Sequence, residues 1–467
     1  MPCFRTSPCQ SRFVSVVVAL ALVCLFVAFA GAQTVSVIYN FDGSIGSNPL
    51  DITMTQGRDG QLYGTTLNGG TFGLGAIFKV TPGGKAALLH SFNGADGQNP
   101  WGGVALGSDG NFYGTAANGG SAGFGVIFKM TPNGAFSVLH SFQNDGVDGV
   151  FPISAPILAS DNKFYGTTQS GGTNNAGAVY RLTLAGTVTI IYNLDSATGS
   201  YGAYSPTQSA DGSLYIATLF GSSADCGSVL RISTTGVLSK SYSFDCAANG
   251  QNPGGPLIQG ADGNFYGTTF NGGKFSAGVL FKLTKNLTNT VLHNFGSTLT
   301  EGTNPAGGVT QATDGKLYGL DSNGGTFGLG TIYGSSLSGS SNTLDNWSTA
   351  VAAQGQLAQH TKGPLYGVTY GGGTNDLGTV FSLNLGLPPF VALVRYQSKI
   401  GGTAQILGQG LTGTTSVTFN GVPATSFKVA SDTYLTAVVP TGATTGPIVV
   451  TTPAGKLKSN KNFRITP

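Results

Sequence analysis

The stretch DGNFYGTTFNGGKFSAGVLFKLT, residues 262–284, decides the fold, because the rest of the chain repeats it. Close copies begin at Asp59 and Asp109, and looser copies begin at Asp161, Asp211, Asp314 and Lys362. The tyrosine of the motif recurs at positions 63, 113, 165, 215, 266, 318 and 366, with separations of 50, 52, 50, 51, 52 and 48 residues. A fixed period of this length is typical of repeat architectures. The sequence therefore predicts seven copies of one structural unit.

Each copy has the pattern of four short antiparallel strands. In the second copy we expect strands at 103–107, 111–116, 126–131 and 136–142, joined by a turn at Asp109-Gly110, a loop at 118–125 and a turn at 132–134. Asp-Gly between two apolar runs is a strong hairpin signal, because the tight turn needs positive φ angles. Four strands per period make one propeller blade. The predicted fold class is all-β, a seven-bladed β-propeller.

The composition supports an ordered chain. It contains 75 glycines and only 9% charged residues among 467, which a disordered low-complexity chain could also show. The 28 Phe and 17 Tyr, however, recur at fixed positions of the repeats, and the glycines occur at turns and loop corners. Ordered all-β structure is the better interpretation.

The first and last repeats are complementary. Residues 34–41 (TVSVIYNF) match the fourth strand of other copies, such as ALLHSF at 87–92, but precede any complete copy. The seventh copy stops near Leu385 without a fourth strand. We expect the strand at 34–41 to complete the seventh blade, closing residues 33–385 into a ring with no open sheet edge.

Residues 1–32 have the features of a signal peptide. Arg5 and Arg12 precede an apolar run over 13–29, and Ala30-Gly31-Ala32 offers a cleavage site. Residues 13–32 could nearly span a bilayer, so an uncleaved anchor is the alternative, and cleavage is favoured. Export to the cell surface or the medium follows. A cleaved signal would leave no membrane span in the mature chain.

The charge balance says little about partners. Without Arg5 and Arg12, the 22 basic residues become 20 against 19 acidic ones, and no basic stretch offers a nucleic-acid footprint. We expect no nucleic-acid partner and a monomer. A polysaccharide or a cell-surface protein is the expected partner.

Two cysteines remain after the signal, Cys226 and Cys246. The third and fourth strands of this repeat turn near Thr235-Gly236, so residues facing each other should have numbers that sum to about 471. The two cysteines sum to 472 and would therefore face each other across the end of the hairpin. In an oxidising compartment this predicts a disulfide.

The composition changes after the repeats. A short linker at 386–389 contains Pro388-Pro389, and residues 390–467 show short alternating strands with frequent turns, as a β-sandwich requires. The segments VTFNGVPA (417–424), LTAVVPTGATTGPIVVTTPAG (435–455) and the final NFRIT resemble an IPT/TIG domain. That resemblance implies an immunoglobulin-like fold.

The repeats resemble the GloVer tandem repeat over about residues 35–385, most closely in copies 1, 2 and 5. The shared pattern is GVxxGxDGNFYGTT, then NGG, FKxTPxG and LHSF. The family comprises exported, choice-of-anchor bacterial proteins of unassigned activity with varied carboxy-terminal anchors. The resemblance thus implies export and no particular reaction. No apolar helix with a basic tail follows the IPT/TIG-like segment, so we expect no anchor there.

Histidines and cations repeat in register. His90, His140 and His293 share one position in the fourth strand and should lie in separate outer strands, so we interpret them as structural. A second set shares one position in the third strand: Lys79, Lys129, Arg181, Arg231 and Lys282. Long stems packed along the blade are favoured for this set over an anion site.

The carboxylates do not predict an enzyme. Glu301 is the only glutamate, and side chain to backbone bonds explain the first-turn aspartates at 59, 109, 161, 211, 262 and 314. The others are scattered among loops: Asp96, Asp145, Asp148, Asp225, Asp245 and Asp376. Glycoside hydrolysis needs two carboxylates at one bond. G-x-S-x-G, HExxH and zinc-ligand spacings are also missing from the sequence.

We therefore predict no catalytic residue, no metal site and no cofactor. Asp- and Asn-rich loops leave calcium binding open, with turn chemistry favoured. The alternative function is a secreted hydrolase or lyase with its site at the propeller axis. A cluster of acids at that axis would be its sign.

Aromatic residues suggest a binding face. By strand counting, one face carries seven of them, in the NGG-type loops and in the connections between blades: Phe72, Trp101, Phe124, Phe151, Tyr204, Phe275 and Phe327. Exposed rings suit stacking on sugars or on a protein partner, and wedging between blades is the alternative. The predicted function is an exported, non-catalytic binding or adhesion scaffold for glycans or proteins.

Overall fold

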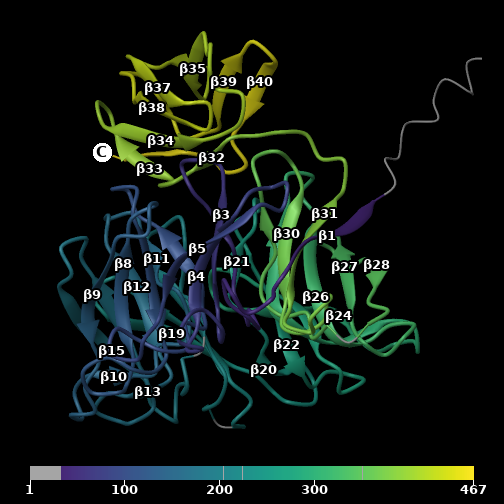
Figure 1. The fold of residues 1–467 in the computed structure, drawn as a ribbon. Coiled ribbons are helices and arrows are strands. Elements are labelled where there is room, and N and C mark those ends of the chain that lie inside the picture. Colours follow the sequence, from purple (N-terminus) through teal and green to yellow (C-terminus); the bar gives the residue numbers. More distant parts are fainter. Residues whose placement is uncertain (1–32, 203, 223, 350, 467) are drawn as a thin grey trace, which may run out of the picture.

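A computed structural model describes residues 33–202, 204–222, 224–349 and 351–466. The predicted signal peptide, residues 1–32, lies outside this part of the chain. The described residues form strands and no helix, so the fold is all-β as predicted. Figure 1 shows the repeats arranged around a common centre, with the C-terminal segment, coloured green to yellow, at one end.

Each repeat forms one antiparallel sheet whose strands follow the chain order. The strands of the first three sheets are β2 (Thr55–Gln56), β3 (Leu62–Thr66), β4 (Ala76–Val80) and β5 (Ala86–Ser91); β6 (Val104–Leu106), β7 (Phe112–Ala116), β8 (Val126–Met130) and β9 (Phe136–Ser141); and β11 (Ile157–Leu158), β12 (Phe164–Thr168), β14 (Ala178–Leu182) and β15 (Val188–Asn193). A short pair beside the third sheet joins β10 (Gly149–Val150) to β13 (Ser170–Gly171).

The later sheets have the same plan. Their strands are β16 (Thr207–Gln208), β17 (Leu214–Thr218), β18 (Ser228–Ile232) and β19 (Leu238–Ser243); β20 (Gln251–Pro253) and β21 (Ile258–Gln259), both paired with β22 (Phe265–Asn271), then β23 (Val279–Leu283) and β24 (Asn289–Asn294); β25 (Gly302–Gln311), β26 (Leu317–Gly324), β27 (Thr331–Ser335) and β28 (Ser341–Asn346); and β29 (Ala358–Gln359), β30 (Leu365–Thr369) and β31 (Thr379–Asn384). First strands of neighbouring sheets contact one another, which places them on the inside.

The amino-terminal strand β1 (Thr34–Asn40) completes the last sheet. It pairs antiparallel with β31, from Thr34 opposite Asn384 to Asn40 opposite Thr379, and Figure 1 shows purple β1 beside green β31. Phe41, which follows β1, is fully buried and packs edge-on against Phe78 of the first sheet at 5.2 Å. The two ends of the repeat array are therefore held together by strand pairing and by a buried aromatic contact.

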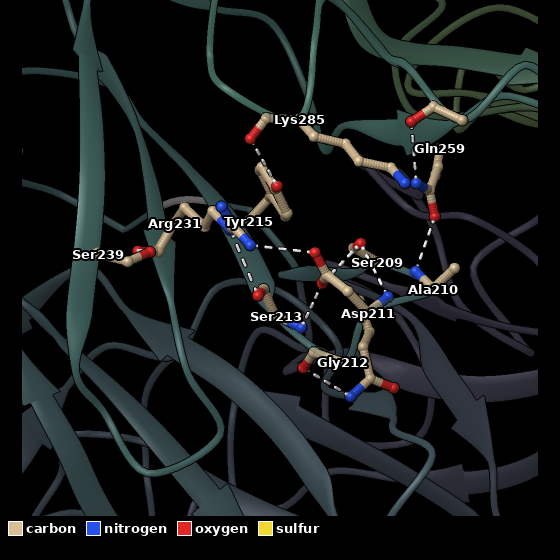
Figure 2. A network of polar contacts seen from close by, with 12 residues as sticks. Ser209, Ala210, Asp211, Gly212, Ser213, Tyr215, Arg231, Ser239, Gln259 and Lys285 are labelled. Atoms are coloured by element: carbon tan, nitrogen blue, oxygen red, sulfur yellow. Dashed lines mark hydrogen bonds and ion pairs between the residues drawn. The ribbon is translucent and has the colours of Figure 1, made fainter. Parts of the chain in front are cut away.

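A glutamine seam links successive sheets. At five junctions, a Gln side chain at the end of a first strand accepts an N–H from the first turn of the preceding sheet. The bonds are Ser160 to Gln208 at 2.7 Å, Ala210 to Gln259 at 3.0 Å, Ala261 to Gln311 at 2.9 Å, Thr313 to Gln359 at 3.0 Å and Thr361 to Gln56 at 3.0 Å. Figure 2 shows the bond between Ala210 and Gln259. The Thr361 bond joins the seventh repeat to the first, so the array is closed.

The first-turn aspartates explain why the motif tyrosine recurs. In the fifth repeat, Asp262 Oδ1 accepts the Asn264 N–H at 3.1 Å, and its Oδ2 accepts the Tyr266 hydroxyl at 2.8 Å. The repeats that begin at 59, 109, 161 and 314 make the same pair of bonds. The predicted turn role of these aspartates is confirmed.

In the fourth repeat the hydroxyl of the motif tyrosine has a different hydrogen-bond partner. Here Arg231 lies 3.0 Å from Asp211, and Tyr215 donates its hydroxyl hydrogen to the Lys285 carbonyl at 3.1 Å (Figure 2). The arginine comes from the set of third-strand cations. Lys129 of that set also lies 3.0 Å from its first-turn carboxylate, Asp109.

A glycine faces an aromatic ring in six of the sheets. The glycine of the YG motif in the second strand is opposite an aromatic residue of the third strand in the pairs Gly64–Phe78, Gly114–Phe128, Gly166–Tyr180, Gly267–Phe281, Gly319–Tyr333 and Gly367–Phe381. A Cβ atom on these glycines would lie 2.3–2.9 Å from the ring. The fourth sheet instead pairs Ile216 with Leu230. Here the second strand has a residue larger than glycine, and the third strand has one smaller than an aromatic residue.

The C-terminal segment forms two further antiparallel sheets. One contains β32 (Ala392–Leu393), β34 (Thr403–Leu407), β38 (Tyr434–Val438) and β37 (Phe427–Ser431); the other contains β36 (Val422–Pro423), β35 (Ser416–Phe419), β39 (Ile448–Thr452) and β40 (Gly455–Lys458). β33 (Gln397–Lys399) pairs in parallel with β41 (Arg464–Thr466). The two sheets enclose their own buried apolar core, which includes Ile406, Phe419 and Leu435.

This C-terminal domain sits on the first turns of the repeats. It donates side-chain hydrogen bonds to residues of five repeats: Thr433 to the Arg58 carbonyl at 2.6 Å, Gln405 to the Ser108 carbonyl at 2.8 Å, Arg395 to the Ser160 carbonyl at 2.6 Å, Arg464 to the Ala210 carbonyl, and Gln409 to the Thr361 hydroxyl at 3.2 Å. The Arg58 guanidinium also lies over the Tyr434 ring at 4.5 Å. One end of the ring is thus covered by the chain itself.

His360 is buried close to this interface. Its side chain is fully enclosed, its Nε2–H donates to the Gly60 carbonyl at 3.0 Å, and its Nδ1 accepts the Lys362 N–H at 3.1 Å. Burial lowers the pKa of His360 from 6.5 to about 4, and protonation of Nδ1 would break the bond from Lys362. The folded protein therefore holds the neutral ring.

This burial predicts acid sensitivity. Between pH 6.5 and about 4, His360 binds a proton in the unfolded chain but stays neutral in the folded chain. The free energy of unfolding therefore falls as the pH falls through this window. From pH 7 to pH 5 we expect His360 to account for a loss of about 2 kcal/mol in the free energy of unfolding. Chemical denaturation at both pH values, in the wild type and in His360→Gln, measures this loss. An equal pH dependence in the two proteins would contradict it.

Candidate ligand-binding site

A pocket of about 160 Å³ lies at the centre of the ring. It is lined by residues of six of the seven repeats: Asp51, Thr53, Trp101, Gly102, Ile153, Ser154, Gln169, Tyr204, Ser205, Leu219, Pro256 and Gly307. Most of these residues directly precede the first strands, whereas the C-terminal domain contacts the turns that follow those strands. The pocket therefore opens at the end of the ring away from the C-terminal domain.

Small residues bring the backbones together around this centre. The position seven residues before the first-turn aspartate (Lys362 in the seventh repeat) holds Ile52, Gly102, Ser154, Tyr204, Gly255, Gly307 and Gly355 in the seven repeats. A Cβ on Gly102 would lie 2.3 Å from the Ser154 Cα, and one on Gly307 would lie 2.1 Å from the Gly355 backbone. Side chains are excluded at those glycines. Ile52 and Tyr204 are the large exceptions at this position, and Tyr204 lines the pocket.

Asp51 comes from a one-residue insertion. Eleven positions separate Asn48 from Asp59, but ten separate the equivalent Asn99 from Asp109. Asp51 adopts a φ of 51°, a left-handed conformation that is uncommon for a residue with a side chain. The insertion is accommodated by this turn of the backbone, and it adds a carboxylate to the pocket lining.

Two aromatic residues flank the carboxylate. The Trp101 Nε1–H donates to Asp51 Oδ2 at 3.3 Å, and both residues are half-buried. Burial raises the pKa of Asp51, and the Trp101 hydrogen bond opposes this only in part. Burial, and secondarily the charge of Asp51, also raises the pKa of Tyr204. The pocket thus combines one carboxylate with an indole and a phenol.

The structure divides the seven aromatic residues predicted for one binding face. Trp101 and Tyr204 meet in the pocket. Phe124 and Phe151 pair edge-on at 5.9 Å, away from the pocket lining. The three remaining rings are exposed: Phe72 (59%), Phe275 (42%) and Phe327 (58%).

The exposed phenylalanines lie at the rim of the ring. The Phe72 N–H donates to Ser91 Oγ on the fourth strand β5, and the Lys274 N–H, beside Phe275, donates to Asn294 on the fourth strand β24. The NGG loops therefore turn outward over the outer strands. Phe72, Phe275 and Phe327 are separate surface rings, and they do not form one platform with Trp101 and Tyr204.

Sequence reasoning missed Asp51 and the polar lining from Ser154, Gln169 and Ser205. It also missed an exposed aromatic pair, Tyr201 and Phe220, with centroids 5.4 Å apart. The signal for Asp51 was available as the one-residue difference in spacing between the first repeat and the others. The signal for Tyr204 was a bulky residue at a position where most repeats have Gly or Ser.

The scattered acids have structural partners. His90 lies 3.1 Å from Asp96, His140 lies 2.7 Å from Asp148, and His293 lies 2.5 Å from Glu301. Backbone N–H groups of their own loops bond Asp145, Asp225, Asp245 and Asp376. The three histidines belong to separate fourth strands, β5, β9 and β24, as predicted.

The pocket itself holds one carboxylate, that of Asp51, among its lining residues. Within the described ranges, no three His, Cys, Asp or Glu side chains gather in a way that could hold a metal ion. In the same part of the chain, no helix has the length and apolar character needed to cross a membrane.

The predicted disulfide is confirmed. Cys226 and Cys246 are joined, with Cα atoms 5.5 Å apart, just beyond the β18–β19 pair in which Ser228 faces Ser243. The bond ties the loop before β18 to the chain that leaves β19. It does not line the pocket.

An all-β array of antiparallel sheets with a pocket at its centre defines a propeller-like protein. The chain belongs to the Gloeobacter/Verrucomicrobia repeat family, whose model matches residues 25–210 and 202–434. The resemblance to the GloVer repeat found in the sequence is thereby confirmed.

Solved propeller structures support the fold. A streptogramin B lyase is 15% identical, with 75% of this chain and 97% of that chain covered and a TM-score of 0.53. A catalytically inactive virginiamycin B lyase from Staphylococcus aureus, solved with quinupristin, is 14% identical, with 75% and 99% covered and a TM-score of 0.53. At these identities the likeness concerns the fold alone. No curated protein matches the chain.

Proposed function

We propose that the chain is an exported binding protein built from a seven-bladed β-propeller and an immunoglobulin-like IPT/TIG domain. One sheet per repeat, with β1 in the last sheet, supports seven blades over residues 33–385. Two packed antiparallel sheets support a sandwich over residues 390–467. The apolar segment before residue 33 and the Cys226–Cys246 disulfide support export.

The proposed function is to bind a terminal sugar unit of a glycan in the central pocket. One observation carries this proposal: three residues that depart from the repeat pattern, Asp51, Trp101 and Tyr204, converge on one pocket. Residues needed only for the scaffold recur from repeat to repeat. These three do not recur, so packing common to all the blades does not account for them.

The chemistry of the lining suits a sugar. Aromatic rings offer flat apolar faces, and Ser154, Ser205 and Gln169 add hydrogen-bonding groups around them. The volume of about 160 Å³ is below the usual range of pockets for drug-sized ligands, so it fits one ring rather than a long chain. A glycosidase of the common type would need a second carboxylate, whereas the lining supplies one.

A glycan-array screen of residues 33–467, followed by calorimetry on the best ligand, tests this proposal. We expect Trp101→Ala and Tyr204→Ala each to weaken binding about tenfold, since stacking on one aromatic ring is worth about 1–1.5 kcal/mol. The matched control is Phe72→Ala, which removes an exposed ring at the rim and should leave affinity within about twofold. All three variants are first compared by melting temperature.

Two results would contradict the proposal. Binding that survives both pocket variants but is lost in Phe72→Ala would move the site to the rim. Cleavage of the bound glycan, seen as release of reducing ends, would favour the hydrolase or lyase alternative.

A further inference from the structure

The central pocket is electronegative. Of its lining residues, Asp51 is the one that carries a formal charge, and neither Lys nor Arg lines the pocket. Tyr204 is the other titratable lining residue, and its raised pKa keeps it neutral. A ligand therefore meets one uncompensated carboxylate between two aromatic residues.

Resting on the proposed function, we infer that the sugar bound in this pocket carries a protonated amine, which Asp51 receives between Trp101 and Tyr204. The class of ligand is an amino sugar with a free amine, such as a glucosamine unit, as distinct from its N-acetylated or neutral counterparts.

The hydrogen bonding of Asp51 leaves room for such a group. Trp101 donates to Oδ2 at 3.3 Å, a long bond, and no described residue donates to Oδ1. An ammonium group has three donors, and its hydrogen bonds to a carboxylate are shorter and stronger than those between neutral groups. The indole and phenol rings add a second attraction, because aromatic faces attract cations.

Burial makes a cationic partner favourable for the Asp51 carboxylate. Desolvation raises the pKa of Asp51, which means that the empty pocket penalises its charged form. An ammonium group at hydrogen-bonding distance would favour the charged form and lower that pKa again. A neutral hydroxyl would satisfy the oxygen but would leave the charge uncompensated.

The backbone at Asp51 supports a role for its side chain. A φ of 51° is adopted most easily by glycine, and Asn and Asp are favoured there among residues with a side chain. The equivalent connections of other repeats contain no such insertion, so the ring can be built without it. The scaffold thus does not require Asp51, and its backbone conformation is uncommon. Its side chain nevertheless carries the only formal charge of the pocket lining.

The test uses calorimetry at pH 6 on residues 33–467 with three tetrasaccharides: glucosamine, N-acetylglucosamine and glucose. We expect the glucosamine tetramer to bind at least about tenfold more tightly than the other two, which corresponds to one charge-assisted hydrogen bond. Asp51→Asn should abolish this preference, so that the affinity for the glucosamine tetramer falls to within about threefold of the affinities for the other two. Asn suits the positive φ, so this variant should fold, and Asp51→Gly is the second variant.

The outcomes separate this inference from the proposed function. Equal binding of the three tetramers, unchanged in Asp51→Asn, would overturn the inference that the ligand carries a protonated amine. It would leave the proposal of sugar binding intact. If no tetramer binds but methylammonium does so in an Asp51-dependent way, cation recognition stands and sugar binding fails. If neither the tetramers nor methylammonium bind, both fail.

Discussion

A variant that lacks residues 34–41 is expected to aggregate or to lose more than about 5 kcal/mol of the stability of the ring, a large part of what a folded domain has. The deletion removes all the pairing of β1 with β31 and leaves β31 as an open edge beside apolar surface. It also removes Phe41, which is fully buried against the first sheet. Loss of a buried Phe side chain alone costs about 3–5 kcal/mol.

Thermal unfolding and size-exclusion chromatography measure this effect. The C-terminal domain encloses its own core, so we expect a separate unfolding transition for it to remain in the deletion variant. The matched control on the same strand is Val37→Ser, because Val37 is 50% exposed and its change should cost less than about 1 kcal/mol. A deletion variant with the melting temperature of the full chain would show that β1 does not close the ring.

Gly166→Ile is expected to lose about 3 kcal/mol or more, the upper range for overpacking a core. A Cβ at Gly166 would lie 2.3 Å from the Tyr180 ring directly across the sheet. The double variant Gly166→Ile/Tyr180→Leu should regain much of that loss, because it reproduces the Ile216–Leu230 pair of the next sheet. Residues in contact commonly show coupling energies of about 0.5–3 kcal/mol, and we expect about 2 kcal/mol here.

A double-mutant cycle by chemical denaturation measures this coupling. The two repeats also have proline at the same sequence position, Pro156 and Pro206. The reciprocal change in the fourth sheet, Ile216→Gly/Leu230→Phe, is the control and should also be better tolerated than Ile216→Gly alone. Additive losses in both cycles would show that the glycine does not depend on the aromatic ring opposite it.

Much of the fold could be predicted from the sequence because its determinants are local. The first-turn aspartates act on residues two and four positions later, so Asp262 and Tyr266 form their bonds within one hairpin. The Cys226–Cys246 bond spans a single pair of strands, so counting from the turn was enough. His90, His140 and His293 were separated correctly because the repeat period alone places them in different sheets.

The site was predicted only in part, because the sequence pattern says which face a loop reaches but not how far it lies from the axis. Trp101 and Phe72 were assigned to the same face, yet Trp101 lines the pocket and Phe72 lies at the rim. Asp51 was missed because the position of its side chain depends on how the backbone accommodates the one-residue insertion. That backbone conformation depends in turn on the neighbouring connections packed around the centre of the ring.

The sequence by itself determined the repeat unit, its strands and turns, the disulfide and the distinct C-terminal segment, because each depends on spacing within about 50 residues. The tertiary structure alone decided that Asp51, Trp101 and Tyr204 meet, and that the C-terminal domain covers the opposite end of the ring. These contacts join residues from about 50 to 375 positions apart. The contacts in the pocket follow from closing the ring, which brings equivalent positions of separate repeats around one axis.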